Sequence, residues 1–111
     1  MKTHHGQCHC GAVQFEITTA LDRVVRCNCS ICRRRSAVMC YVDAAHFVLS
    51  AGQEHLTEYR FHTKTTRHFF CNVCGIFPFL EYQGVHCVNV GCLDDVDPYE
   101  LEPELIDGRA F

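Results

Sequence analysis

The sequence lacks the features that would direct it to a membrane, to secretion or to nucleic acid. No uninterrupted apolar stretch approaches the ~18 residues that a membrane-spanning helix needs. The first residues, Met1 to Gly6, lead straight into cysteines without the apolar core of a signal peptide. The net charge of the 111 residues is −3, so no global basic field exists to attract nucleic acid or an anionic membrane. We therefore expect a cytoplasmic protein with no membrane partner and no nucleic-acid partner.

Linkers, internal repeats and low-complexity segments are also missing, and glycine and proline are scattered singly. Hydrophobic residues make up 48% of the chain and charged residues 21%, which excludes wholesale disorder. A chain of 111 residues has room for one modest core. We therefore expect residues 1–111 to form a single domain.

The hydrophobic pattern is mostly that of strands. Residues 12–18 and 56–62 alternate apolar and polar side chains, and residues 37–42 form the continuous apolar run of a strand buried on both faces. Shorter apolar runs follow at 46–49, 68–70, 76–80 and 86–90. Helical signals are weak, since residues 29–35 allow one short turn and residues 98–105 are acidic and contain two prolines. The sequence predicts a mainly β domain with short strands and little helix.

Cysteine is the residue present in excess, with ten in the chain. Seven of them fall into three groups: Cys8 and Cys10; Cys27, Cys29 and Cys32; and Cys71 and Cys74. The last pair has the spacing Cys-x-x-Cys followed by Gly75. Two thiolates at that spacing converge on one ion only if the chain turns tightly, and glycine supplies the positive φ that ends such a turn. The three groups together indicate metal binding.

Cysteines at these spacings have three possible uses: zinc binding, disulfide bonds and iron–sulfur clusters. A disulfide framework suits secreted chains, but a two-residue spacing rarely suits a structural disulfide, and cysteines in a reducing compartment act first as thiolate ligands. Iron–sulfur clusters are the other alternative, but Cys-x-Cys-x-x-Cys is not one of their usual spacings. Zinc is therefore the metal that the spacing favours.

Counting ligands divides the seven cysteines unequally. Two tetrahedral zinc ions need eight ligands, so a closed site of four leaves a site of three with one open position. The three cysteines of one short loop, Cys27, Cys29 and Cys32, form a natural set. The other natural set pairs Cys8 and Cys10 with Cys71 and Cys74, a pairing that spacing alone does not prove. Four protein ligands are typical of a structural zinc, and three with an exchangeable ligand are typical of a catalytic one.

The order of these motifs resembles the GFA family, which is named for glutathione-dependent formaldehyde-activating enzyme and also contains centromere protein V-like proteins. The resemblance covers nearly the whole chain and rests on four segments, residues 6–15, 27–34, 70–75 and 89–95. It implies an Mss4-like, β-rich, zinc-binding fold. It also implies a structural zinc on Cys8, Cys10, Cys71 and Cys74, and a second, more labile zinc on Cys27, Cys29 and Cys32.

An open zinc with three thiolates suits soft ligands, so an incoming thiol can bind it, lose its proton and remain nucleophilic. With the resemblance, this predicts a zinc-dependent carbon–sulfur lyase that acts on thiol–aldehyde adducts such as S-hydroxymethylglutathione. Its small-molecule partners are then a glutathione-like thiol and formaldehyde or another aldehyde. The alternative is a non-catalytic zinc scaffold or thiol-responsive module, in which Cys40, Cys87, Cys92 or a histidine closes the second site.

Several other residues have both a functional and a structural interpretation. Arg33 and Arg34 follow the three-cysteine loop and could bind a carboxylate of an anionic thiol, or simply be solvated. Ser30 could donate to a thiolate or only form the turn. His62 and His68 could line a site, and Asp94 and Asp95 could supply an acid or base, although exposed or structural roles explain them equally well. The remaining cysteines, which are Cys40, Cys87 and Cys92, lie in apolar runs typical of a core.

Overall fold

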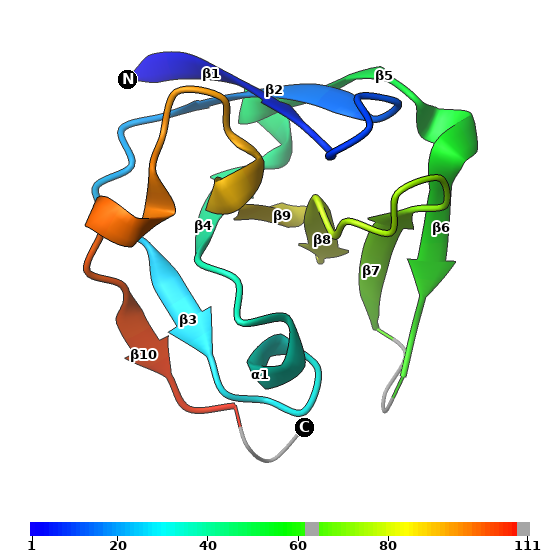
Figure 1. The fold of residues 1–111 in the computed structure, drawn as a ribbon. Helices are drawn as coiled ribbons and strands as arrows, with labels where there is room; N and C mark the ends of the chain where they lie inside the picture. The colour runs from blue at the N-terminus through cyan, green and yellow to red at the C-terminus, as the bar shows by residue number, and fades with distance from the viewer. Residues whose placement is uncertain (62–64, 109–111) are drawn as a thin grey trace.

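The computed structural model describes residues 1–61 and 65–108, and His62 lies outside these ranges. The described chain forms two sheets, and in Figure 1 the smaller sheet lies across the top with the strands of the larger sheet below it. The smaller sheet has the strand order β1-β2-β5, and all its neighbours are antiparallel. Its strands are β1 (Lys2–Gln7), β2 (Gln14–Thr19) and β5 (Phe47–Ala51).

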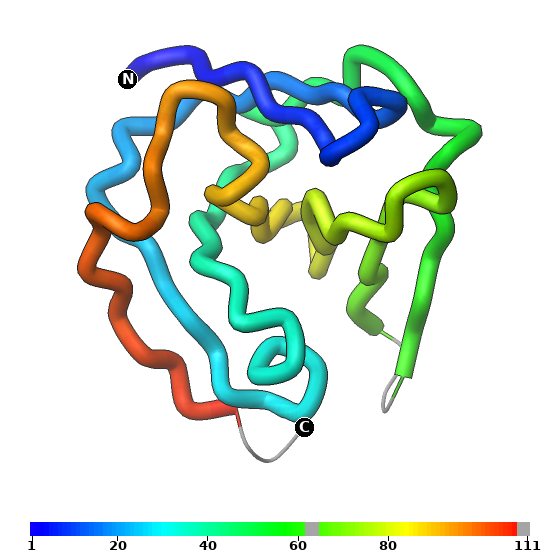
Figure 2. The backbone as a smooth tube through the Cα atoms, in the orientation of Figure 1, coloured from blue at the N-terminus to red at the C-terminus, as the bar shows by residue number. Residues whose placement is uncertain are grey.

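The larger sheet has seven strands in the order β10-β3-β4-β9-β8-β7-β6. The strands are β3 (Val25–Cys27), β4 (Met39–Asp43), β6 (Leu56–Tyr59), β7 (Thr66–Cys71), β8 (Phe79–Tyr82), β9 (Val85–Asn89) and β10 (Glu104–Ile106). Neighbouring strands are antiparallel except for β10, which runs parallel to β3. Figure 2 shows the last part of the chain running back beside the segment that contains β3. The end of the described chain therefore lies against the loop that follows β3.

Helix is confined to short pieces. The single α-helix of the described chain, α1 (Cys32–Arg35), is one turn long and ends at Ser36, which has a φ of 53°. The 3₁₀ turns are Ala44–His46, Gln53–His55, Val90–Cys92 and Pro98–Glu100. No helix in residues 1–61 and 65–108 is both long enough and apolar enough to cross a membrane.

The main core lies between the two sheets and is centred on aromatic rings. Phe15 of β2 is fully buried, and its ring centroid lies 5.6 Å from that of Phe47 and 5.9 Å from that of Phe79. Gly6 pairs with Phe15 across β1 and β2, and a Cβ at Gly6 would meet the Phe15 ring at 2.3 Å. Glycine at this position therefore lets the ring cover the backbone of β1.

The expectation of a mainly β fold with little helix is confirmed, while β1, β3 and β10 lie outside the predicted strands; β1 and β10 show why. β1 is polar, and its buried His4 is held by Asp95 through a hydrogen bond of 2.9 Å. β10 is mostly exposed and begins at the end of residues 98–105, a segment for which no strand was predicted. Both strands are specified by distant partners rather than by their own hydrophobic pattern.

Candidate metal centres

Four cysteines from two distant parts of the chain form one cluster, here called the four-thiol cluster. Cys8 and Cys10 come from the turn between β1 and β2, Cys71 ends β7, and Cys74 follows it. The four sulfur atoms all lie within 4.8 Å of one another, with Cys10 Sγ 3.6 Å from Cys8 Sγ and 3.7 Å from Cys71 Sγ. The cluster therefore fastens the smaller sheet to the larger one.

Tight backbone turns produce this convergence. Gly11 and Gly75, one after each pair, have φ values of 81° and 83°. The Gly75 N–H donates to the carbonyl oxygen of Cys71 at 2.8 Å, and the Gly11 N–H donates to that of Cys8 at 3.3 Å. A second set of N–H groups points at the sulfurs, from Val13 to Cys8 Sγ at 3.3 Å and from Val73 to Cys71 Sγ at 3.4 Å. The Val13 N–H favours the thiolate form of Cys8.

The electrostatics of the four-thiol cluster favour binding of a cation. Burial opposes ionisation of Cys74, but hydrogen bonds from the backbone and from neighbouring thiols outweigh it and lower its pKa to about 6. At Cys10 the Ala12 N–H favours the thiolate, yet burial and the three neighbouring sulfurs raise its pKa to about 11. One thiol thus ionises easily while another keeps its proton, because negative charges this close repel. A divalent cation removes that repulsion and allows all four to ionise.

The second group, here called the three-thiol cluster, consists of Cys27 at the end of β3, Cys29 in the loop and Cys32 at the start of α1. Its sulfurs also lie within 4.8 Å of one another. The Cys29 N–H donates to Cys27 Sγ and the Cys32 N–H donates to Cys29 Sγ, each at 3.4 Å. Burial raises the pKa of Cys32 above its ordinary value. At Cys29 burial acts in the same direction, but hydrogen bonds from the Cys32 N–H and from the neighbouring thiols outweigh it and lower the pKa.

In the described part of the chain, no fourth cysteine, histidine or carboxylate brings a ligand atom into the three-thiol cluster. Cys40, Cys87 and Cys92, the cysteines considered as closing ligands, are buried, and none of them brings its sulfur within 4.8 Å of all three sulfurs of the cluster. The Cys87 thiol donates to Met39 Sδ at 3.8 Å, and the Cys92 thiol donates to the Phe77 carbonyl oxygen at 3.8 Å. The three-thiol cluster therefore has one coordination position that this part of the protein does not fill.

The last described residues, Ile106 to Gly108, pack against the loop of the three-thiol cluster and form hydrogen bonds with it. The Asn28 N–H donates to the Ile106 carbonyl oxygen at 3.2 Å, and the Gly108 N–H donates to Asn28 Oδ1 at 2.8 Å. Gly108 is buried against the cluster, and a Cβ there would lie 2.7 Å from Cys27 Sγ. Sequence reasoning missed both residues, because nothing near residue 28 indicates a contact 80 positions away.

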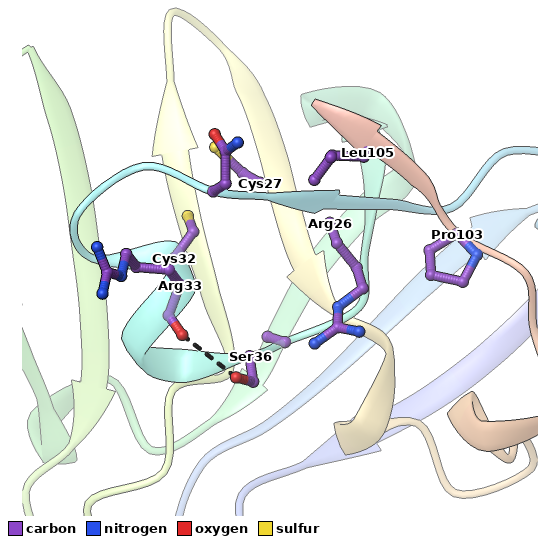
Figure 3. A pocket seen from close by; sticks show the side chains of 9 residues that line it. Arg26, Cys27, Cys32, Arg33, Ser36, Pro103 and Leu105 are labelled. Carbon is purple, nitrogen blue, oxygen red and sulfur yellow. Dashed lines mark hydrogen bonds between the residues drawn. The ribbon is translucent and has the colours of Figure 1, made fainter. Parts of the chain in front are cut away.

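One face of the three-thiol cluster opens on a basic cleft of about 510 Å³. In Figure 3, Arg33 extends from α1 and Arg26 from β3, with the side chains of Cys27 and Cys32 between them. Of the two arginines predicted to bind an anion, Arg33 lines this cleft. Arg34 instead donates to the Ser30 carbonyl oxygen at 2.7 Å. Arg26, a residue that sequence reasoning did not single out, supplies the second positive charge.

A third arginine faces the protein interior. The Arg35 guanidinium carbon lies 3.7 Å from the centroid of the Phe77 ring, and Nη1 donates to His68 Nδ1 at 3.0 Å. Burial lowers the pKa of Arg35 below its ordinary value, and the charges that favour its protonated form are those of nearby cysteines, Cys32 first. Arginine stays protonated at neutral pH, so Arg35 is a fixed positive charge beside the three-thiol cluster.

His68 is buried, and burial together with the charge of Arg35 lowers its pKa to about 4. Its ring is therefore neutral at pH 7. Because arginine only donates, Nδ1 must accept, which places the ring proton on Nε2. His68 lines a second cavity next to the three-thiol cluster, which makes this histidine a candidate for function there.

The other candidate residues, Asp94, Asp95 and Ser30, make contacts that indicate no catalytic role. Asp94 Oδ2 accepts from His5 Nδ1 at 2.6 Å, and Asp95 Oδ2 accepts from Lys2 Nζ at 2.8 Å. Both carboxylates thus hold β1 rather than face either thiol cluster. Ser30 is exposed in the loop of the three-thiol cluster.

The donor chemistry of the two clusters fits zinc. All ten cysteines lie in the described ranges and are free thiols. Closely spaced sulfurs with backbone N–H donors suit a soft, thiolate-binding ion, and the four-thiol cluster has the ligand count of a closed tetrahedral site. Both clusters could therefore hold metal ions, and zinc is consistent with their ligands.

Comparison with known proteins agrees with these observations. A crystal structure of a Rhodobacter sphaeroides protein, a structural genomics target, superimposes with a TM-score of 0.87 and 36% sequence identity. The match covers 92% of this chain and 99% of that one. The family model described as glutathione-dependent formaldehyde-activating enzyme matches residues 3–107. The chain therefore belongs to the GFA family, the family of the glutathione-dependent formaldehyde-activating enzyme.

Proposed function

We propose that this protein is a carbon–sulfur lyase that carries two zinc ions and acts on adducts of a glutathione-like thiol with an aldehyde. Membership of the GFA family supports glutathione and formaldehyde chemistry in general. The observation that carries the specific proposal is the three-thiol cluster, which has no fourth ligand in the described chain and is open to a cleft. The four-thiol cluster holds the structural zinc.

The reaction breaks one bond and moves one proton. In the lyase direction the carbon–sulfur bond of the adduct breaks, and the sulfur leaves with the electron pair as a thiolate. The hydroxyl group gives up its proton to solvent, and its oxygen becomes the carbonyl oxygen. Zinc, when held by three thiolates, supplies an open position at which a thiol is kept ionised at neutral pH.

The chain's own residues bind and orient the adduct. Arg26 and Arg33 line the basic cleft, and they bind the carboxylates of the thiol. Arg35 offsets the negative charge that builds up on sulfur as the bond breaks. His68, neutral at pH 7, donates from Nε2 to the adduct oxygen, on which negative charge develops.

The central experiment measures how fast glutathione and formaldehyde exchange with their adduct, by exchange NMR. Because the adduct also forms without a catalyst, the zinc-loaded protein must raise the exchange rate above that of buffer with zinc. Cys27→Ser removes a ligand of the three-thiol cluster, and we expect it to abolish this increase. Cys92→Ser is the matched control, since Cys92 lies outside both clusters and a hydroxyl can also donate to the Phe77 carbonyl.

An unchanged exchange rate with stoichiometric zinc-loaded protein would refute the lyase. The non-catalytic alternative would then need an eighth ligand that residues 1–61 and 65–108 do not provide. Zinc stoichiometry tests the metal assignment separately. We expect two zinc ions per chain, falling to one after mild chelation, with the circular dichroism spectrum retained. One zinc from the start would overturn the assignment of the second site.

A further inference from the structure

A second cavity reaches the three-thiol cluster from a different side than the basic cleft. Its volume is about 590 Å³, and Cys27, Cys29 and Cys32 form part of its wall. Strands β4, β8 and β9, the loop before α1 and the segment before β7 supply its apolar lining. The main apolar side chains are Ile31, Met39, Phe61, Leu80, Tyr82 and Val85.

This cavity differs from the basic cleft in chemistry. Among the described residues, no lysine or arginine lines it, and the one carboxylate in its wall, Asp107, is exposed. Its inner wall is apolar, since Met39 is 2% exposed and Leu80 is 9% exposed. Cys87 also lines it, with a thiol bonded to the Met39 sulfur. Apart from thiols, hydroxyls and the exposed Asp107, the polar group that the cavity offers is the neutral ring of His68.

The size of the cavity is far beyond what formaldehyde needs. Formaldehyde has two heavy atoms, whereas cavities of 300–1,000 Å³ hold drug-sized ligands, so a volume of about 590 Å³ suits a substituent as large as an aromatic ring. Burying apolar carbon on the lining of this cavity is favourable in proportion to the area removed from water. An anionic substituent would lose its hydration there without gaining a positively charged partner, because no lysine or arginine lines the described cavity.

The two cavities share Cys27 and Cys32 in their walls, and one cavity is basic while the other is apolar. A thiol–aldehyde adduct also has two different halves. Its sulfur joins the anionic part, which comes from the thiol, to the carbon that comes from the aldehyde. We propose that the apolar cavity binds the carbon substituent of the adduct, so that the preferred carbonyl compound is an apolar aldehyde about the size of an aromatic ring. This inference deepens the function proposed above and rests on it for the identity of the adduct.

Binding of stable thioethers tests the inference without turnover. S-benzylglutathione and S-methylglutathione have the same anionic body, and neither has the hydroxyl group that the reaction requires. We expect the zinc-loaded protein to bind the benzyl compound about tenfold more tightly or better, because the phenyl ring is buried in the cavity. Titration calorimetry gives both dissociation constants.

Two variants with the same substitution localise the effect. Val85 lines the cavity and is 37% exposed, so Val85→Glu introduces a carboxylate into the apolar wall with little strain. Val48 lies on β5 in the smaller sheet, is 58% exposed and does not line the cavity. We expect Val85→Glu to remove most of the preference for the benzyl compound and leave the affinity for the methyl compound unchanged. Val48→Glu should behave as the wild type, and thermal denaturation checks that both variants are folded.

The outcomes separate this inference from the proposed function. Equal affinity for the two thioethers overturns the inference, even if the protein accelerates exchange of glutathione with formaldehyde. A benzyl preference that survives Val85→Glu also overturns it, because the ring then binds elsewhere. A benzyl preference that Val85→Glu removes supports the cavity assignment, even in a protein that fails the exchange experiment and is therefore not a lyase.

Discussion

Replacing Gly52 by alanine tests how the fold positions the four-thiol cluster. Gly52 follows β5 with a φ of 89°, and a Cβ at this position would lie 2.0 Å from the Ala12 carbonyl oxygen. The same Cβ would lie 2.8 Å from Val13 Cα. These atoms are backbone atoms of the turn between β1 and β2, which also carries Cys8 and Cys10. The clash can be relieved only if this turn moves.

The expected cost has two parts. An alanine held at positive φ costs ~1–2 kcal/mol. Overpacking against backbone that cannot rotate away adds ~1–3 kcal/mol, so Gly52→Ala should lower the free energy of unfolding by ~2–5 kcal/mol in total. Gly84→Ala is the matched control, because Gly84 has a φ of 81° but no atom of the described chain within 4 Å of where its Cβ would stand. Only the first part of the cost applies there.

Urea unfolding of the zinc-loaded proteins measures the loss of stability in both variants. The rate at which thiols react with a modifying reagent shows directly whether the cysteines of the four-thiol cluster have become exposed. Cys8 is 2% exposed and Cys71 is fully buried, so neither should react quickly in the wild type or in Gly84→Ala. In Gly52→Ala the displaced turn should expose them and weaken zinc binding at this cluster. Equal destabilisation by the two substitutions, with equal thiol reactivity, would refute the close approach of Gly52 to the turn.

Three further predictions concern single side chains. Gly108→Ala places a methyl group 2.7 Å from Cys27 Sγ, so bound zinc should fall from two ions to one per chain with the circular dichroism spectrum unchanged. Arg35→Met should weaken zinc at the three-thiol cluster about tenfold in a chelator competition, because a partly buried positive charge is lost, whereas Arg34→Met should not. Hydrogen bonds from its lysine and histidine partners on β1 lower the pKa of Asp95 to about 2. A carboxyl group with a pKa below its unfolded value stabilises the fold above pH ~4 and loses this effect as the pH falls towards 2. Asp95 is partly solvent-exposed, so Asp95→Asn should cost only ~1 kcal/mol at pH 6, and urea unfolding should show the difference from wild type shrinking in acid.

The sequence predicted the grouping of the seven cysteines because the relevant information is local. A spacing of one or two residues already limits which sulfurs can converge, and Gly11 and Gly75 indicate where the chain turns. The alternation in β2 was equally informative, since Phe15 and Ile17 are buried while Glu16 between them is exposed.

The parts that could not be predicted are built from distant segments. β10 has no hydrophobic alternation of its own, and it is a strand because Glu104 to Ile106 pair with Val25 to Cys27. The apolar cavity combines residues from six places in the sequence, so no single motif marks it. His68 was considered from the sequence, but its tautomer could not be predicted, because it depends on Arg35, 33 positions away.

The parallel pairing of β10 with β3 sets an order on the assembly of the protein during its synthesis. All four sulfurs of the four-thiol cluster have left the ribosome once residue 74 is clear of it, so this cluster can take its metal while the rest of the chain is still being made. The three-thiol loop is complete much earlier, at residue 32, but its brace, residues 104–108, is the last described part to be synthesised. Early in synthesis the loop therefore lacks these contacts, and its final geometry arises only once residues 104–108 have also left the ribosome.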